Sequence, residues 1–323
     1  MSKKYDELYQ AIKGASNILI VPHKYPDGDA LGSALAFYIA LKRMGKHVWL
    51  ISHTPIPNKY KFLSENYTFL PLDLVTSDLD LIIGVDCADK ERLNLPDEYL
   101  KKAKIVVNID HHVTNDNFGD INIVQRMAAT GEIIVDIFDE FGFEIDKDIA
   151  TCLYTAIATD TGNFMYSNTT QNSFEKTARL FNTGFEFVDI ARRLFLEKSL
   201  AQTRLIGLAI SKMEMYQDEK IALITVSRDD MASVGAKEGD CETLVNTAVD
   251  VESVLVAVFI REITKSFFKV SFRSKGDYDV AKTSQVYGGG GHKNAAGCAV
   301  NGDFDTVKNN VISLVKDMFF KSE

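Results

Sequence analysis

The sequence has 323 residues, more than one hydrophobic core usually fills, so two domains are expected. Its formal net charge of -9 leaves few cations for long duplex nucleic acid, although a local basic patch would suffice for a short phosphate ligand. The longest apolar runs are strand-sized, so no membrane partner is expected, and residues 1–6 lack the apolar core of a secretory signal.

The four cysteines are scattered along the chain without any CxxC pair, at Cys87, Cys152, Cys241 and Cys298. This spacing argues against structural zinc and against a disulfide framework. We expect the thiols to pack as small apolar groups in a cytoplasmic protein.

The chain begins with an amphipathic helix expected over 5–15 and an apolar strand over 17–22. A tight strand-to-helix turn follows, before the helical spacing of apolar residues over 30–44. This turn carries His23, Asp27 and Asp29. An Asp-x-Asp pair in an extended loop can aim both carboxylates to one side, which suits two neighbouring cations, although a single such loop is commonly only a turn.

Three further strands are expected over 46–52, 79–86 and 104–109. The second of them ends on Asp86, and the third runs into the triplet Asp110-His111-His112. Such a triplet alone is more often a strand cap than a binding site. Ligands in open α/β sheets gather at the carboxyl ends of strands, so the recurrence of Asp or His at these ends indicates a shared site.

Helices are expected over 130–141 and 149–159, and the second finishes at Asp160. The helix dipole disfavours a carboxylate there, so a cation beside Asp160 would explain its position. Imidazole and carboxylate ligands without thiolate favour Mn²⁺, or a similar octahedral ion such as Mg²⁺, over structural zinc. Two ions about 3.5 to 4 Å apart, bridged by one carboxylate, would activate a shared water for in-line attack on phosphorus.

The last third combines strands with a glycine run. Strands are expected over 220–226, 253–262 and 267–273, after a long helical connector over 189–216. Lys269, Ser271 and Arg273 would share one strand face, which is either a solvated face or a phosphate-binding one. The run that begins at Gly288 lets backbone amides approach an anion, and we expect 293–296 to open a short helix toward it. The expected nucleotide contacts are Arg261, Arg273, Gly290, Gly291 and His292.

Taken together, these motifs resemble a known family. In order and spacing, His23-x-x-x-Asp27-x-Asp29, Asp86, Asp110-His111-His112 and Asp160 resemble the four motifs of the DHH phosphoesterases. The segment 288–297 is similar to the signature of the associated DHHA1 domain. The two-domain form resembles the NrnA-type subgroup, whose members are oligoribonucleases of very short RNA and phosphatases of 3',5'-bisphosphoadenosine.

This resemblance implies an α/β fold with a DHH catalytic domain over 1–188, whose mostly parallel sheet is flanked by helices. A helical linker over 189–216 would join it to a smaller α/β DHHA1 domain over 217–323 that binds substrate.

The resemblance also implies roles for the motif residues. His23 and Asp27 would hold one ion, and Asp29, His111 and Asp160 would hold the other, with Asp86 as the bridge. Asp110 would orient a histidine, and His112 would contact phosphate or give a proton to the leaving oxygen.

The function implied is an Mn²⁺-dependent phosphoesterase that releases 5'-mononucleotides from short RNA oligonucleotides and AMP from adenosine 3',5'-bisphosphate. One alternative keeps this chemistry on cyclic di-AMP or its linear product, and another is a non-catalytic nucleotide-binding regulator, which the complete ligand set disfavours. The glycine-rich signature speaks against a pyrophosphatase. Apolar helices of the first domain could pair two chains as a homodimer or simply form its core.

Overall fold

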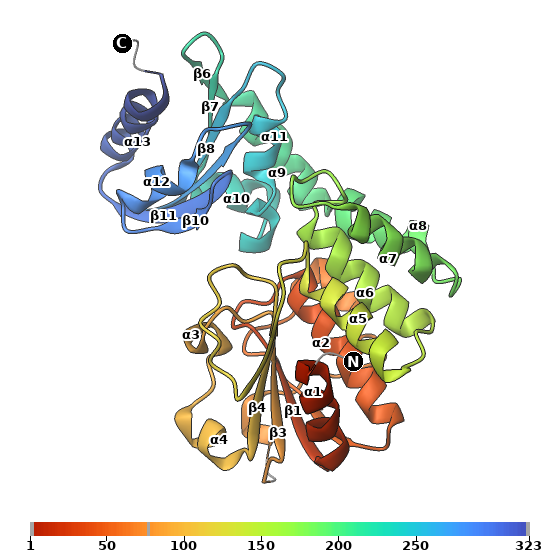
Figure 1. The fold of residues 1–323 in the computed structure, drawn as a ribbon. Coiled ribbons are helices and arrows are strands. Elements are labelled where there is room, and N and C mark those ends of the chain that lie inside the picture. Colours follow the sequence, from red (N-terminus) through yellow and green to blue (C-terminus); the bar gives the residue numbers. More distant parts are fainter. Residues whose placement is uncertain (1–2, 76–77, 321–323) are drawn as a thin grey trace. The chain divides into compact units, whose positions relative to one another are not determined.

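The structure, a computed structural model, describes residues 3–75 and 78–320. The chain divides into two compact units, one that ends at Glu197 and one that begins at Lys198 (Figure 1). The expected domain limits at Met1 and Glu323 lie outside the described residues. The functional limits expected near 188 and 217 stay predictions.

The first unit contains a five-stranded sheet in which all described neighbours are parallel, as expected. In spatial order its strands are β2 (His47–Leu50), β1 (Asn17–Pro22), β3 (Leu81–Val85), β4 (Ile105–Asp110) and β5 (Ile121–Val124). The residues of β3 are all buried and apolar, which suits a parallel strand covered on both faces. Because β1, β3 and β4 are neighbours, the polar residues that follow their carboxyl ends meet at one edge.

Helices cover both faces of this sheet. Figure 1 shows α1, α2, α5 and α6 on one side and α3 and α4 on the other. The helical segments of this unit are α1 (Lys3–Gly14), α2 (Gly28–Arg43), η1 (Asn58–Ser64), η2 (Leu72–Leu74), α3 (Lys90–Leu93), α4 (Asp97–Lys102), α5 (Thr130–Phe141), α6 (Lys147–Asp160), α7 (Gln171–Phe181), α8 (Phe187–Ala191) and the π-helical turn η3 (Arg192–Leu196). A Cβ on Gly32 would overlap the carbonyl oxygen of Cys152, so the glycine permits the close approach of α2 and α6. This contact brings together the helices that carry Asp29 and Asp160.

The second unit contains a mixed six-stranded sheet in the order β10-β11-β9-β8-β7-β6, parallel only between β7 and β8 among the described pairs. The strands are β6 (Glu214–Tyr216), β7 (Ile221–Val226), β8 (Val256–Thr264), β9 (Phe267–Ser274), β10 (Gly290–His292) and β11 (Ala295–Asn301). The helical segments are α9 (Leu200–Ser211), α10 (Arg228–Val234), η4 (Glu238–Cys241), α11 (Leu244–Val249), α12 (Val280–Gln285) and α13 (Phe304–Phe319). One apolar cluster packs α9 and α11 on one face, and another packs α12 and α13 on the opposite face. The α/β fold class is therefore confirmed.

Two expectations for local structure differ from the fold. The helix expected at 293–296 is wrong, because these residues turn β10 into β11, in a hairpin that pairs Gly291 with Ala296. Ala296 and Cys298 are buried while their neighbours are more exposed, which is the period of a strand and not of a helix. The connector expected over 189–216 is helical in α8, η3 and α9, but it is interrupted over 197–199 and ends in β6.

Candidate metal centre

Asp86 lies at the middle of the site. It follows β3 in a left-handed conformation, with φ of 59°, and its backbone N–H donates to the carbonyl of Ile109 at 2.9 Å. Its Oδ2 is 3.6 Å from Nε2 of His23, and its Oδ1 is 3.6 Å from Nε2 of His111. The hydroxyl of Thr130 donates to Oδ1 at 2.9 Å. One carboxylate thus faces histidines from two different strands.

The first group of potential ligands lies on the turn between β1 and α2. Nε2 of His23 is 3.7 Å from Oδ1 of Asp27, which also caps α2 by accepting from the N–H of Ala30 at 3.1 Å. With Asp86, these side chains offer three ligand atoms that lie within 4.8 Å of one another.

The second group joins three separate segments. Nε2 of His111 is 3.9 Å from Oδ2 of Asp29 and 3.4 Å from Oδ2 of Asp160. Nδ1 of His111 lies 3.1 Å from the carbonyl oxygen of Met127. A carbonyl only accepts, so Nδ1 carries the proton and the lone pair of Nε2 points to the carboxylates. His111 therefore presents the nitrogen that a cation would need.

Asp29 is held by the first turn of α5. Its Oδ2 accepts from the N–H of Thr130 at 2.6 Å, and its Oδ1 accepts from the N–H of Gly131 and the hydroxyl of Ser33, each at 2.9 Å. The amino end of a helix stabilises a carboxylate through these unpaired amides. Sequence analysis placed the start of this helix at Thr130 but did not connect it to the site.

His112 lies beside both groups, and its ligand atom is within 4.8 Å of those of Asp86 and His111, but its Nδ1 is held in a separate hydrogen-bond network. Its Nδ1 donates to Oδ1 of Asp110 at 2.8 Å, and Asn115 donates to Oδ2 of Asp110 at 2.6 Å. Asn115 also donates to the carbonyl of Cys87 at 3.0 Å and accepts from Asn108 at 3.2 Å. Although Nδ1 of His112 is 3.7 Å from Asp86, its bond to Asp110 leaves Nε2 as the available nitrogen. Asn115 was missed because nothing in its sequence context distinguishes it from a loop residue.

The charges at the site explain the shifts in pKa. Burial, together with the neighbouring carboxylates, raises the pKa of Asp29 and of Asp86 above their ordinary value. Burial also raises the pKa of Asp160 to about 7. The charge of Asp86 adds to this rise, whereas His111 opposes it. Burial by itself would raise the pKa of Asp27. The hydrogen bond and charge of His23 outweigh burial and lower this pKa to about 2. Carboxylates crowded in this way are stabilised by a cation.

Two family models and several known proteins match this chain. The family model described as "DHH family, N-terminal domain" matches residues 17–157, and the "DHHA1 domain" model matches residues 218–319. A Thermus thermophilus protein named "Bifunctional oligoribonuclease and PAP phosphatase NrnA" is 32% identical over 314 residues, which cover 96% of this chain and 92% of that protein.

The chain belongs to the DHH/DHHA1 family, as an NrnA-like member. It is a hydrolase that acts on phosphoester bonds. A Bacillus subtilis protein of the same name is 27% identical, with 91% of this chain and 92% of that protein covered. A solved structure of an exopolyphosphatase-related protein from Bacteroides fragilis matches with a TM-score of 0.92 and 27% identity, covering 98% of this chain and 96% of the other.

The expected nucleotide contacts of this DHH/DHHA1 protein lie on the sheet of the second unit. Strand register places His292, Ala295 and Arg273 in one cross-strand row, and Gly290 and Gly297 in another. The side chains of His292 and Arg273 therefore share one sheet face and are separated by Ala295, whereas Gly291 pairs with Ala296 in the row between.

Arg261 differs from the other expected contacts. Its side chain is only 5% exposed and forms an ion pair with Glu238. The structure therefore places this guanidinium inside the unit, where the carboxylate of Glu238 neutralises it. A contact between Arg261 and substrate stays a prediction.

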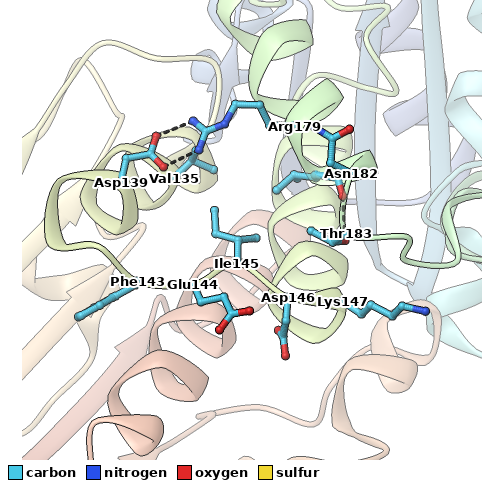
Figure 2. A pocket seen from close by; sticks show the side chains of 11 residues that line it. Val135, Asp139, Phe143, Glu144, Ile145, Asp146, Lys147, Arg179, Asn182 and Thr183 are labelled. Atoms are coloured by element: carbon cyan, nitrogen blue, oxygen red, sulfur yellow. Dashed lines mark hydrogen bonds and ion pairs between the residues drawn. The ribbon is translucent and has the colours of Figure 1, made fainter.

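One surface cavity of about 550 Å³ lies apart from the centre. Figure 2 shows Val135 and Ile145 lining it, with Arg179 paired to Asp139 at its rim. None of its lining residues belongs to either ligand group.

In the part of the chain that the structure describes, no helix is both long and apolar enough to cross a membrane.

Proposed function

We propose that this protein uses two divalent ions, preferably Mn²⁺, to hydrolyse phosphoester bonds of nucleotides. Its substrates are short oligoribonucleotides, which yield 5'-mononucleotides, and 3',5'-bisphosphoadenosine, which yields AMP and phosphate. The observation that carries this proposal is the position of Asp86 between the two ligand groups, with one oxygen toward His23 and the other toward His111. The named activities of the Thermus thermophilus and Bacillus subtilis relatives support the substrates.

The residues fit a pair of cations. The buried carboxylates of Asp29 and Asp86 have raised pKa values because of burial and of neighbouring acids, and two positive ions would remove that repulsion. All the donors are imidazole nitrogens or carboxylate oxygens, a set that suits Mn²⁺ or Mg²⁺. His23, Asp27 and Asp86 would hold one ion, and Asp29, Asp86, His111 and Asp160 the other. Bound ions would polarise the phosphoryl group and lower the pKa of a water molecule.

The protein's own groups then supply orientation and a proton. Burial would lower the pKa of His112, but its hydrogen bond to Asp110 and the charge of Asp86 raise it to about 8. At neutral pH the imidazolium carries a proton on Nε2 while Nδ1 donates to Asp110. Nε2 is thus the atom that would contact phosphate or protonate the leaving oxygen.

The second unit would bind the nucleotide away from the ions. Arg273 is half-buried and His292 is exposed, and strand pairing aligns both with Ala295. Gly290 and Gly297 lie in one cross-strand row with Ser271, and without side chains they leave the backbone open to a phosphate or sugar. We propose Arg273, His292, Gly290 and Gly291 as substrate contacts, and Arg261 only where Glu238 releases it.

We also place the reaction in the cytoplasm. All four cysteines lie within the described residues, and each is buried and unpaired. Thiols remain unpaired in a reducing compartment, which supports this location.

Product analysis tests the function. The panel contains 3',5'-bisphosphoadenosine, a 5'-phosphorylated dinucleotide RNA, cyclic di-AMP, pyrophosphate and a longer RNA, each with Mn²⁺, Mg²⁺ or a chelator. We expect Mn²⁺-dependent release of AMP or mononucleotides from the first two substrates, lost in Asp86→Ala. Turnover confined to cyclic di-AMP would replace the proposed substrates, and binding without turnover of any compound would refute the proposed mechanism.

A further inference from the structure

The loop that follows Asp160 has an unusual backbone. Three consecutive residues are left-handed, with φ of 56° at Gly162, 57° at Asn163 and 64° at Phe164. A bulky side chain rarely adopts this conformation, and it persists where the surroundings fix it, often at functional sites. Here the N–H of Asn163 donates to the carbonyl of Ala158 at 2.7 Å and so returns the chain toward α6.

The ring of Tyr166 lies face-on against Gly162. A Cβ at position 162 would come closer than 3 Å to three consecutive ring atoms of Tyr166, Cδ1, Cε1 and Cζ. These three distances are nearly equal, so that point lies over the ring face and not at its edge. The backbone of Tyr166 is fixed as well, since it donates to the carbonyl of Thr161 at 3.0 Å and accepts from the N–H of Thr169 at 3.1 Å.

The exposure of Tyr166 indicates that the opposite face of this ring reaches solvent. The side chain of Tyr166 is 56% exposed although one face rests on Gly162. Close by in sequence, Phe164 stacks with Phe174 of α7 at a centroid distance of 5.2 Å and an interplanar angle of 25°. Phe174 is itself exposed. A rigid aromatic face turned to solvent suits a flat ligand better than it suits core packing.

This loop is attached to the metal centre. Nδ2 of Asn168 donates to the carbonyl oxygens of Asp160 at 3.0 Å and Ala128 at 3.1 Å. Two peptide units separate Gly162 from Asp160, so their Cα atoms are at most about 7.6 Å apart. A nucleoside joined to a phosphate at Asp160 would therefore have its base within reach of Tyr166.

We propose that the open face of Tyr166 stacks on the nucleobase of the nucleotide whose phosphate is bound beside Asp160. This inference rests on the proposed function, and it identifies the nucleobase as the part of the substrate that the loop after Asp160 binds. Every base has a π-face, so such a stack accepts purines and pyrimidines alike. It would give the centre affinity for a nucleotide over a sugar phosphate, without selecting a sequence.

The test compares AMP with ribose 5-phosphate, which lacks the base, by calorimetric titration of the Mn²⁺-loaded full-length protein. We expect wild type to prefer AMP, and Tyr166→Ala to weaken AMP binding about 5- to 150-fold, the contribution of one base–aromatic stack. The affinity for ribose 5-phosphate should not change. Tyr166→Phe keeps the stacking face and should retain the preference, as should Met165→Ala at the exposed neighbouring side chain.

The outcomes separate this proposal from the function on which it rests. If wild type bound neither compound, the proposed function would fail and the stacking proposal with it. If wild type preferred AMP and Tyr166→Ala kept that preference, only the stacking proposal would be wrong. Sedimentation of both proteins adds a further check: if wild type formed a dimer and Tyr166→Ala did not, with unchanged AMP affinity, the ring would be a subunit contact instead.

Discussion

Oδ1 of Asp110 accepts a hydrogen bond from Nδ1 of His112 at 2.8 Å, and this contact fixes the orientation of the imidazole ring. Asp110 is fully buried, and its other oxygen accepts from Nδ2 of Asn115 at 2.6 Å and from the backbone N–H of His112 at 3.3 Å. The three side chains form a series in which each positions the next. His112 is the member whose free nitrogen would face the substrate, so the other two act through it.

The first prediction concerns this series. Asn115→Ala should lower kcat about 10- to 100-fold with little change in KM, because Asp110 would lose its 2.6 Å donor and His112 its fixed orientation. In a His112→Ala background, the same change should cost little more, since there is no ring left to orient.

The control for this experiment is Asp116→Ala, an exposed residue on the same loop, which should leave kcat unchanged. Reductions that multiply in the double mutant would show that Asn115 acts independently of His112. Thermal unfolding of each variant distinguishes loss of orientation from loss of folding.

The second prediction concerns pH and metal. Burial and the charge of Asp86 raise the pKa of Asp160 from 3.8 to about 7, so the folded metal-free protein holds this proton more tightly than the unfolded chain. The contribution of this bound proton to folding stability is complete below the pKa that Asp160 has in the unfolded chain. It is lost as the pH rises through about 7. Bound Mn²⁺ would replace that proton, so the increase in Tm on adding Mn²⁺ should be larger at pH 7.5 than at pH 5.5.

Asp160→Asn should reduce this pH dependence, because the amide does not titrate. Glu144→Gln, an exposed acid outside the ligand groups, should leave it intact. Scanning calorimetry with and without Mn²⁺ at both pH values provides the measurement. Equal increases in Tm at the two pH values would argue against the coupling between this carboxyl and the ion.

The third prediction concerns the contact between α2 and α6. Gly32→Ala places a methyl group against the carbonyl oxygen of Cys152 and should lower the free energy of unfolding by about 1 to 3 kcal/mol. It should also weaken Mn²⁺ binding, because these helices carry Asp29 and Asp160. Gly14→Ala at the end of α1, where a Cβ meets nothing within 4 Å, serves as the control and should not destabilise. Unchanged stability in Gly32→Ala would mean that the helices separate without cost.

The fourth prediction concerns the second unit. Arg273→Ala should raise KM for a 5'-phosphorylated dinucleotide about 10-fold or more and leave kcat nearly unchanged, because a charged hydrogen bond to substrate is removed without touching the metal ligands. Lys265→Ala removes an exposed cation from the turn between β8 and β9 and should leave both constants unchanged. An unchanged KM in Arg273→Ala would remove this residue from the substrate contacts.

Much of the first unit could be predicted because its signals are local. Each of the strands β1, β3 and β4 is an apolar run that stops at His or Asp, and parallel neighbours bring such ends together. The six expected ligands consequently converge in the first and second ligand groups described above. Periodicity also located α2, α5 and α6 to within a few residues.

The features that were not predicted depend on contacts between distant segments or on side chains without a pattern. The bond from Thr130 to Asp29 joins residues 101 apart in sequence, and no local rule shows it. The strands β10 and β11 are rich in glycine and alanine, whose weak hydrophobic signal does not separate strand from helix. Likewise, a sequence does not show that Glu238 reaches the guanidinium of Arg261.

Anomalous diffraction from crystals grown with Mn²⁺ would show whether six side chains form one two-ion centre around Asp86. We expect two anomalous peaks about 3.5 to 4 Å apart, with Asp86 touching both. One peak should lie beside His23 and Asp27, and the other beside Asp29, His111 and Asp160. Asp86→Asn crystals should lose at least one peak. A single peak that does not touch Asp86, or two peaks that persist unchanged in Asp86→Asn, would contradict that arrangement.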